Sequence, residues 1–321
     1  MIKFHIPGIM RFDIINTILI NLLKEHKEYF YDDISIAGIY GSFTPCLWNG
    51  GRVFTGNYQD QNKRKEIVQK YNDLGIGIIY TFTNTSVDSR GYADYLCNSD
   101  MDNIINNTDI NKIIIADENL KQYIKNKYSD KDLKFILSIT SDVVLEKDMK
   151  LLKELEDQYD LIVPNYNFNN TKSLLNTKNP SKYEILLNPQ CVDNCKFEKE
   201  HYKSISDVNS EKITALEQFQ CPYESNTIYK LENFINNKAF IKVEDLYSKY
   251  KDKGFTTFKI NGRTTDEWNV VQYYLYYMVK PEYKDTVFEY FSDYVEEYDD
   301  IIEPNNNSNI YPKVEINPTN E

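Results

Sequence analysis

The chain alternates short apolar runs with longer segments in which apolar residues recur every three or four positions. The short runs are apolar on both faces, which is typical of strands buried in a parallel sheet. The longer segments, at 14–23, 67–74, 120–128 and 144–155, have the period of amphipathic helices. The pattern predicts eight strands, at 3–6, 34–41, 77–82, 112–116, 134–139, 161–164, 183–187 and 256–260.

Strands that alternate with helices in this order form parallel βαβ units. About eight such units predict an α/β fold of the (β/α)8 TIM-barrel type, either regular or distorted. An open doubly wound sheet is the alternative, although no glycine-rich phosphate loop follows the first predicted strand.

The spacing of the strands predicts a single barrel domain over residues 1–300. The longest stretch between predicted strands, 189–241, contains three of the five cysteines and is predicted to cap the barrel. From residue 301 to 321 the sequence is rich in Asn and Pro and has no helical or strand period, so we expect a flexible tail there.

The loops at the carboxyl ends of barrel strands carry the chemistry in this fold. That rule selects Asn84, Asn165 and the cysteines that follow residue 188, together with the segments 41–52 and 259–263. Two of these segments also contain basic residues suited to an anion, which are Arg52, Lys259 and Arg263. The alternatives are a surface Arg52 in a tight loop, and an Arg263 that pairs with Asp266 or Glu267.

Five cysteines in a chain of this length favour metal or redox roles over a disulfide framework. Cys191 and Cys195 lie four positions apart in one turn, Cys221 follows in the same excursion, and Cys46 belongs to the same predicted rim. Four thiolates suit either zinc or an iron–sulfur (4Fe–4S) cluster, and ligand count does not separate the two. Unrelated buried thiols are the alternative, which we favour for Cys97.

The formal net charge of −12 disfavours a dedicated nucleic-acid binder, because a polyanion is repelled. No apolar run approaches the ~20 residues that span a bilayer. The first residues also lack the features of a signal peptide, so we expect a cytoplasmic protein without a membrane partner.

Three pieces of sequence carry a resemblance to a known family. They are Asn188-Pro189-Gln190-Cys191 with the spacing to Cys195, Glu200-His201-Tyr202, and the run from Phe258 to Arg263 that reads FKINGR. Over 183–283 the chain resembles the collagenase-like peptidase family, which includes barrel proteins implicated in RNA base hydroxylation and anaerobic ubiquinone hydroxylation. The resemblance implies a barrel and, as in several members, a four-cysteine iron–sulfur cluster. Asn261 departs from the family pattern, which usually has an acid there.

The leading hypothesis is therefore an iron–sulfur barrel enzyme, hydroxylase- or oxidoreductase-like, acting on a small anionic organic substrate. Arg52, Lys259 and Arg263 would hold the anion, while His201 serves as proton donor or ligand, or else lies on a helix surface. One alternative is a non-catalytic binding protein stapled by zinc. Another is a peptidase or peptide-binding protein, although no Ser–His–Asp pattern or His-Glu-x-x-His motif occurs. The sequence identifies no redox or protein partner.

Overall fold

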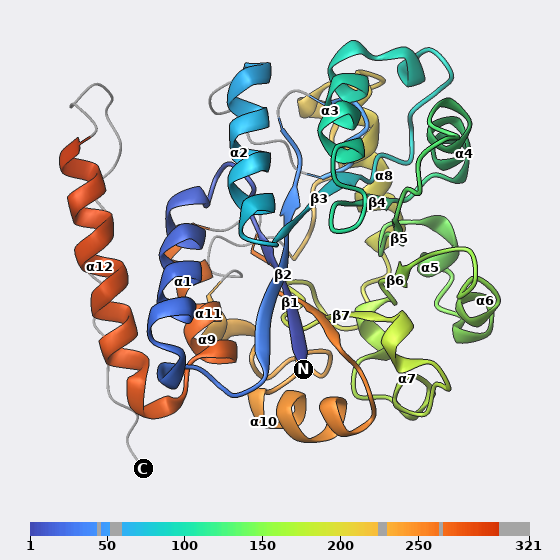
Figure 1. The fold of residues 1–321 in the computed structure, drawn as a ribbon. Helices are drawn as coiled ribbons and strands as arrows, with labels where there is room; N and C mark the ends of the chain where they lie inside the picture. The colour runs from blue at the N-terminus through green and yellow to red at the C-terminus, as the bar shows by residue number, and fades with distance from the viewer. Residues whose placement is uncertain (44–45, 52–59, 224–229, 263–265, 302–321) are drawn as a thin grey trace.

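Eight parallel strands form the centre of the molecule (Figure 1), in the sheet order β6-β5-β4-β3-β2-β1-β8-β7. The computed structural model describes residues 1–43, 46–51, 60–223, 230–262 and 266–301, with side chains up to residue 295. All eight predicted strands are present: β2 and β3 have the predicted bounds, β1 is two residues longer, and the other five are one to three residues shorter. Their bounds are β1 (Ile2–Pro7), β2 (Ile34–Gly41), β3 (Gly77–Phe82), β4 (Lys112–Ile115), β5 (Phe135–Leu137), β6 (Leu161–Ile162), β7 (Glu184–Leu186) and β8 (Thr257–Lys259).

The two edge strands of this sheet approach each other and nearly close it. A single parallel bridge joins Ile162 in β6 to Tyr183, the residue before β7. Tyr183 also donates a hydrogen bond of 2.6 Å to the buried carboxylate of Glu156, which precedes β6. The fold is therefore a (β/α)8 TIM-like barrel, and the prediction is confirmed over an open doubly wound sheet.

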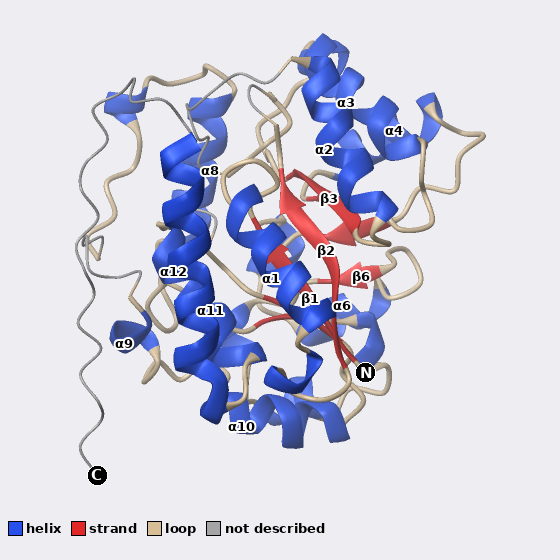
Figure 2. Ribbon diagram, turned by 60° about the vertical axis from the view of Figure 1, so that its left-hand side comes forward, coloured by secondary structure: helices blue, strands red, loops and turns tan. Residues whose placement is uncertain are grey.

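Helices surround the strands (Figure 2) and bury their apolar faces against the sheet. The last helix, α12, packs on α1 and α11 at the outside of the barrel. None of the helices in the described ranges is long and apolar enough to cross a membrane. The helix bounds are α1 (Asp13–Glu25), α2 (Gln61–Asp73), α3 (Tyr95–Ile105), α4 (Glu118–Lys127), α5 (Asp142–Leu145), α6 (Met149–Glu154), α7 (Lys172–Leu175), α8 (Glu198–Asn209), α9 (Leu231–Phe234), α10 (Val243–Asp245), α11 (Glu267–Met278) and α12 (Lys284–Ile301).

The single helix predicted over 144–155 is wrong, because two short helices, α5 and α6, occupy this segment. Lys147 between them has a φ of 55°, in the left-handed region that ends a right-handed helix. Asp148 then starts α6, since its carboxylate accepts a hydrogen bond of 2.8 Å from the Lys150 amide. The apolar period continues across the break, and for that reason the pattern alone suggests one helix.

The interior of the barrel has an apolar side and a charged side. Tyr40, Ile79, Ile114, Ile136 and Val163, from β2 to β5 and the end of β6, pack together as one buried cluster. On the other side, strands β7, β8 and β1 contribute charged or ionisable side chains to the interior, namely Glu184, Lys259 and His5.

Helix α8, in the excursion after β7, lies over the carboxyl end of the barrel. It is tied to the loop after β3 by side-chain contacts: Ser86 Oγ donates to Asp207 at 2.6 Å, and the Thr85 amide donates to Ser206 Oγ at 3.2 Å. Asn209, at the end of α8, donates from Nδ2 to the carbonyls of Asn49 and Gly51 at 2.8 and 2.9 Å. These contacts place α8 directly above the strand ends. Of the predicted tail, only Ile301, which ends α12, is within the described residues.

Candidate active site at the carboxyl end of the barrel

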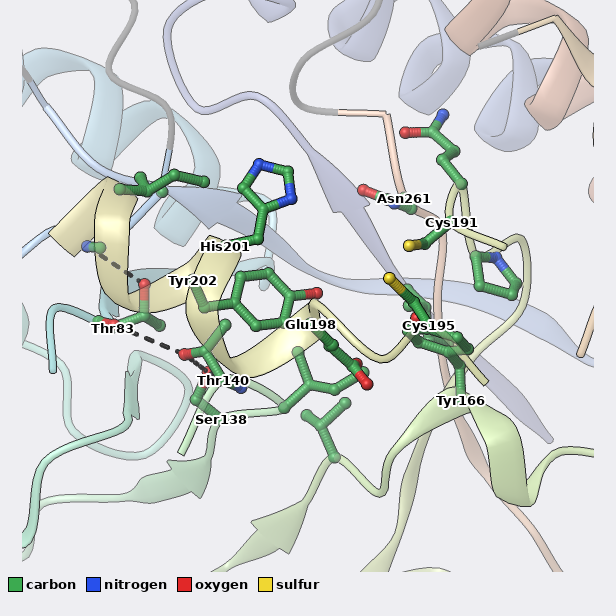
Figure 3. A pocket seen from close by; sticks show the side chains of 18 of the residues that line it. Thr83, Ser138, Thr140, Tyr166, Cys191, Cys195, Glu198, His201, Tyr202 and Asn261 are labelled. Atoms are coloured by element: carbon green, nitrogen blue, oxygen red, sulfur yellow. Dashed lines mark hydrogen bonds between the residues drawn. The ribbon is translucent and has the colours of Figure 1, made fainter. Parts of the chain in front are cut away.

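A cavity of about 250 Å³ lies between the carboxyl ends of the strands and helix α8 (Figure 3). Strands β2, β3, β4, β7 and β8, the segments that follow β2, β3, β5, β6 and β7, and α8 all contribute to its wall, so residues far apart in sequence meet there. This is the position at which barrel proteins carry their chemistry. The side chains used below that line it are Tyr40, Thr83, Ile114, Ser138, Thr140, Val163, Tyr166, Leu186, Cys191, Cys195, Glu198, His201, Tyr202, Cys221 and Lys259.

One part of the cavity wall combines aliphatic side chains with an ammonium group. Ile114, Val163 and Leu186 supply aliphatic surface, and Lys259 at the end of β8 reaches in beside them. The Lys259 Nζ atom lies 4.0 Å from the centre of the Tyr40 ring, a cation–π contact. Among the described lining residues, Lys259 is the only lysine or arginine. It therefore gives this wall its positive charge.

A buried carboxylate compensates that charge from inside the barrel. Glu184 is fully buried, and its Oε1 atom lies 2.7 Å from Nδ1 of His5. Burial alone would raise the pKa of Glu184, but the nearby Lys259, His5 and Lys112 outweigh it and hold the pKa below its usual value. Within the described part of the chain, the second oxygen, Oε2, has no hydrogen-bond partner. Glu184 is thus an ionised group held in place mainly by neighbouring positive charge.

Hydroxyl groups line the wall formed by the ends of β3 and β5. Ser138 Oγ and Thr140 Oγ1 are 2.9 Å apart, and Thr140 Oγ1 donates to the Thr83 carbonyl at 3.4 Å. The Gly50 amide donates to Thr83 Oγ1 at 3.2 Å, which joins the loop after β2 to the same wall. A side chain at Gly50 would not fit, because its Cβ atom would lie 2.1 Å from the Thr83 oxygen.

Cys191 and Cys195 lie next to each other at one side of the cavity (Figure 3). Burial raises the pKa of the Cys191 thiol to about 11, and the neighbouring Cys195 and Glu198 add to the rise. The nearby Tyr166 hydroxyl lowers the pKa and so acts in the opposite direction. At neutral pH Cys191 is therefore mainly a thiol, and it reacts as a nucleophile only when a bound group or a base removes its proton.

The turn that carries these two cysteines is held by the segment 237–239. Asn237 Nδ2 donates to the Cys191 carbonyl at 2.7 Å, and the carboxylate of Asp193 accepts from the amides of Lys238 and Ala239 at 3.1 and 3.3 Å. Asn194 has a φ of 50°, a conformation that Asn tolerates better than most residues. Hydrogen bonds between side chains and the backbone therefore fix the turn that carries the two thiols.

Glu198 fixes the first turn of α8 to the barrel. Its Oε1 atom accepts a hydrogen bond of 3.0 Å from Nδ2 of Asn165, which follows β6. Lys147 Nζ lies 3.1 Å from Oε2 as an ion pair, without the alignment of a hydrogen bond. Because Glu198 is almost completely buried and holds two partners, it positions α8 over the cavity.

His201 and Tyr202 project from α8 toward the cavity (Figure 3). The His201 ring centre lies 5.8 Å from that of Phe219, and 6.4 Å from that of Tyr202 in a stacked arrangement. Burial is the main reason that the Tyr166 hydroxyl has a raised pKa, and Tyr202 and Glu198 add to it. Tyr166 therefore stays protonated and able to donate a hydrogen bond.

The four cysteines expected at one metal centre are not together. Cys191, Cys195 and Cys221 line the cavity, whereas the Cys46 sulfur lies 2.8 Å from that of Cys97. The loop after β2 turns Cys46 inward against α3 and away from the cavity wall. No group of three or more His, Cys, Asp or Glu within the described ranges is arranged to hold a metal ion. The residues described here therefore do not fit a four-thiolate cluster.

Of the predicted substrate-binding residues, Lys259 and His201 line the cavity. Asn84 and Asn165 are not among its described lining residues, because their side chains complete other contacts. Asn84 Nδ2 donates to the Leu47 carbonyl at 2.7 Å and to Ser210 Oγ at 2.9 Å, and the Asn165 amide holds Glu198. Arg52 and Arg263 lie outside the described residues.

The sequence analysis missed several lining residues. Ser138 lies near the end of the predicted strand 134–139, and Thr140 directly follows it. The rule that functional residues follow the carboxyl ends of barrel strands would have selected both, had it been applied to every strand. Tyr166, Glu198 and Tyr202 give no such signal, because an irregular turn and the rotation of α8 decide which side chains face the cavity.

No protein-family model matches the sequence, and no curated protein matches it. Among solved structures, the chain is similar to the U32 peptidase Mk0906, with 13% sequence identity and a TM-score of 0.48. The alignment covers 83% of this chain and 95% of that chain. A likeness at this level carries no conclusion about the chemistry of the cavity.

Proposed function

We propose that this chain is a barrel enzyme, hydroxylase- or oxidoreductase-like, that acts on a small anionic organic substrate bound in the cavity. The observation that carries the proposal is the Lys259 ammonium group on the otherwise apolar wall formed by Ile114, Val163 and Leu186. An organic acid matches this wall, because its carboxylate or phosphate meets the charge and its carbon skeleton meets the aliphatic side chains.

The surroundings of Lys259 favour a ligand with one negative charge at that point. The Lys259 charge lowers the pKa of the buried Glu184, so the two groups attract each other, and Lys259 also lines the space that a substrate would occupy. Charge-assisted contacts in such sheltered places are stronger than those at an open surface. The hydroxyls of Ser138 and Thr140, on the β5 side of the cavity, would bind a second polar group of the substrate.

The thiols of Cys191 and Cys195 are the candidates for the reacting groups. They line the same cavity as Lys259, and a hydroxyl donor, Tyr166, contacts Cys191. A cluster that also uses Cys46 does not fit this arrangement, so we assign no step to it. Zinc or iron bound by Cys191, Cys195 and Cys221 would require these side chains to rearrange, because within the described residues they do not form a metal-binding group; metal analysis tests this proposal.

The test of the substrate class starts from a thermal-shift screen of small carboxylates and phosphates with the full-length protein. For any acid that binds, Lys259→Met should weaken the affinity by about tenfold or more, the scale of ~1.5–3 kcal/mol for a charge-assisted contact. Lys259→Arg should keep part of the affinity, and Lys172→Met, an exposed change on α7, should leave it unchanged.

Lys259→Met also leaves Glu184 without its main counter-charge and therefore destabilises the protein. The double variant Lys259→Met with Glu184→Gln removes that complication and should fold, yet still bind the acid weakly. Equal affinity in wild type and the double variant would show that the anion lies elsewhere. Absence of binding by every acid in the screen would count against the substrate class itself.

The metal proposal is tested by metal and sulfide analysis of anaerobically purified protein. If Cys191, Cys195 and Cys221 hold the ion, Cys191→Ser should lose most of it, whereas Cys46→Ser should retain it, because Cys46 contacts Cys97 instead. Equal loss of metal in both variants would support a site that uses Cys46 together with the other three cysteines. Wild-type protein without metal would leave the thiols as the reacting groups.

A further inference from the structure

Two cysteines outside the cavity form a second thiol pair. Cys46, in the loop after β2, and Cys97, in the first turn of α3, place their sulfur atoms 2.8 Å apart. Cys97 is fully buried and Cys46 is 6% exposed. The two residues are 51 positions apart in sequence, so only the fold brings them together.

The surrounding contacts hold both sulfur atoms where they are. The Trp48 amide donates to Cys97 Sγ at 3.3 Å, and the Trp48 indole donates to the Gly91 carbonyl at 3.0 Å. Asp94 caps α3 by accepting from the Cys97 amide at 2.7 Å. A small movement along the line between the sulfurs would bring them to the ~2.05 Å of a covalent bond. The pair is therefore already arranged for bond formation.

We propose that Cys46 and Cys97 are a dithiol oxidation site, which a small disulfide such as oxidised glutathione converts into an intramolecular disulfide. The Cys46 thiolate, the more exposed of the two, attacks the oxidant and releases one glutathione thiol. The Cys97 thiolate then attacks the Cys46 sulfur and releases the second. Two protein thiols and one glutathione disulfide thus yield one protein disulfide and two glutathione thiols.

The chemistry of Cys97 sets the rate of this reaction. Burial, followed by the contact with Cys46, raises the pKa of the Cys97 thiol far above its ordinary value. Thiol–disulfide exchange proceeds through the thiolate, so the second step is slow at neutral pH and faster at alkaline pH. The formation of the cross-link should therefore be faster at pH 9 than at pH 7.

The cross-link would stiffen one wall of the cavity. Cys46 begins the described segment 46–51, which ends in the lining residues Gly50 and Gly51. A covalent link to Cys97 ties this segment to α3 and closes a loop of about fifty residues, which restricts the unfolded chain. A rise in melting temperature on the order of 5 °C or more should follow oxidation.

The experiment incubates the full-length protein with oxidised glutathione, alkylates the remaining thiols in denaturant and digests with trypsin. The sequence places Cys46 in peptide 28–52, Cys97 in 91–112, Cys191 with Cys195 in 183–196, and Cys221 in 213–230. We expect peptides 28–52 and 91–112 to be recovered as one cross-linked species that dithiothreitol separates. Complete alkylation of both peptides, or a link from 28–52 to 183–196, would overturn the proposal.

Matched variants separate the cross-link from other oxidation. Cys46→Ser should abolish both the linked species and the gain in melting temperature, and Cys221→Ser should preserve both. An unchanged gain in Cys46→Ser would contradict the stabilising role. Cys97→Ser should behave as Cys46→Ser does, and if it does not fold, wild type and Cys46→Ser still decide the question.

Discussion

Arg64 and Asp100 form an ion pair that connects α2 to α3 in the interior of the protein. Arg64 Nη1 donates to Asp100 Oδ1 at 2.8 Å, and both side chains are almost completely buried. Burial raises the pKa of Asp100 to about 7, because it outweighs the opposing charge of Arg64. Within the described part of the chain, Asp100 Oδ2 has no hydrogen-bond partner. A buried ion pair of this kind costs more desolvation than its attraction returns.

This pair makes stability depend on pH in a definite direction. The folded protein holds the Asp100 proton up to about pH 7, whereas the unfolded chain loses it near 4. Between these values the folded state binds more protons, so the free energy of unfolding falls as pH rises. Relative to Asp100→Asn, wild type should lose on the order of 1–4 kcal/mol between pH 4 and pH 7.

Denaturant unfolding of both proteins at several pH values measures that difference. The comparison with Asp100→Asn cancels the titration of the other carboxylates, which is the same in the two proteins. If the advantage of wild type instead grows toward neutral pH, Arg64 dominates the pair and the pKa of Asp100 is lowered.

At the scale of elements, the eight strands could be predicted because each lies in a short run of mainly apolar residues that the fold largely buries. The helix break at Lys147 could not, because the apolar period continues through it and only the backbone conformation shows it. The candidate site residues likewise include some that the sequence could predict and some that it could not. Lys259 follows from its place at a strand end, whereas Glu198 faces the cavity because of contacts with Asn165 and Lys147, which are remote in sequence.

The attachment of α8 gives a prediction at this scale. Glu198→Ala should destabilise the protein by about 3 kcal/mol, because it leaves the buried Asn165 amide and the Lys147 ammonium without their partner. Glu200→Ala, in the same first turn but exposed, should change stability by less than about 0.5 kcal/mol. Urea unfolding of the two variants makes the comparison. Similar losses would mean that helix-dipole effects, and not the buried contacts, account for the change.

At the scale of the whole molecule, the barrel is closed unevenly. Strands β1 and β2 pair along six residues each, whereas β6 and β7 are joined through one bridge and the side chains around Tyr183. The sequence predicts a barrel that is regular or distorted, but it does not locate this weak seam. A strand of two residues and one of six arise from apolar runs of similar length. Register and strand tilt, which decide closure, depend on all the strands together.

We expect the seam to open more readily than the rest of the sheet. Backbone amides in β6 and β7 should exchange with deuterium at least tenfold faster than those in β1 and β2, which corresponds to ~1.4 kcal/mol of opening free energy. Tyr183→Phe, which removes the hydrogen bond to Glu156, should increase the difference, whereas the exposed Tyr95→Phe should not. Hydrogen-exchange mass spectrometry measures both. If amides exchange equally slowly in all the strands, the single bridge is sufficient to keep β6 and β7 together.

The seam between β6 and β7 also marks a point at which the chain could be cut into two pieces. In the sheet, β1 to β6 form one uninterrupted group, and β7 pairs with β8, which reaches that group through β1. A cut after the exposed Lys178 would therefore coincide with the seam and leave every extended strand pairing possible. The only ladder shared by the two pieces would be that of β1 with β8. The described strands are in this sense bipartite, and we expect two separately encoded polypeptides, 1–178 and 179–321, to reassemble through the β1–β8 ladder.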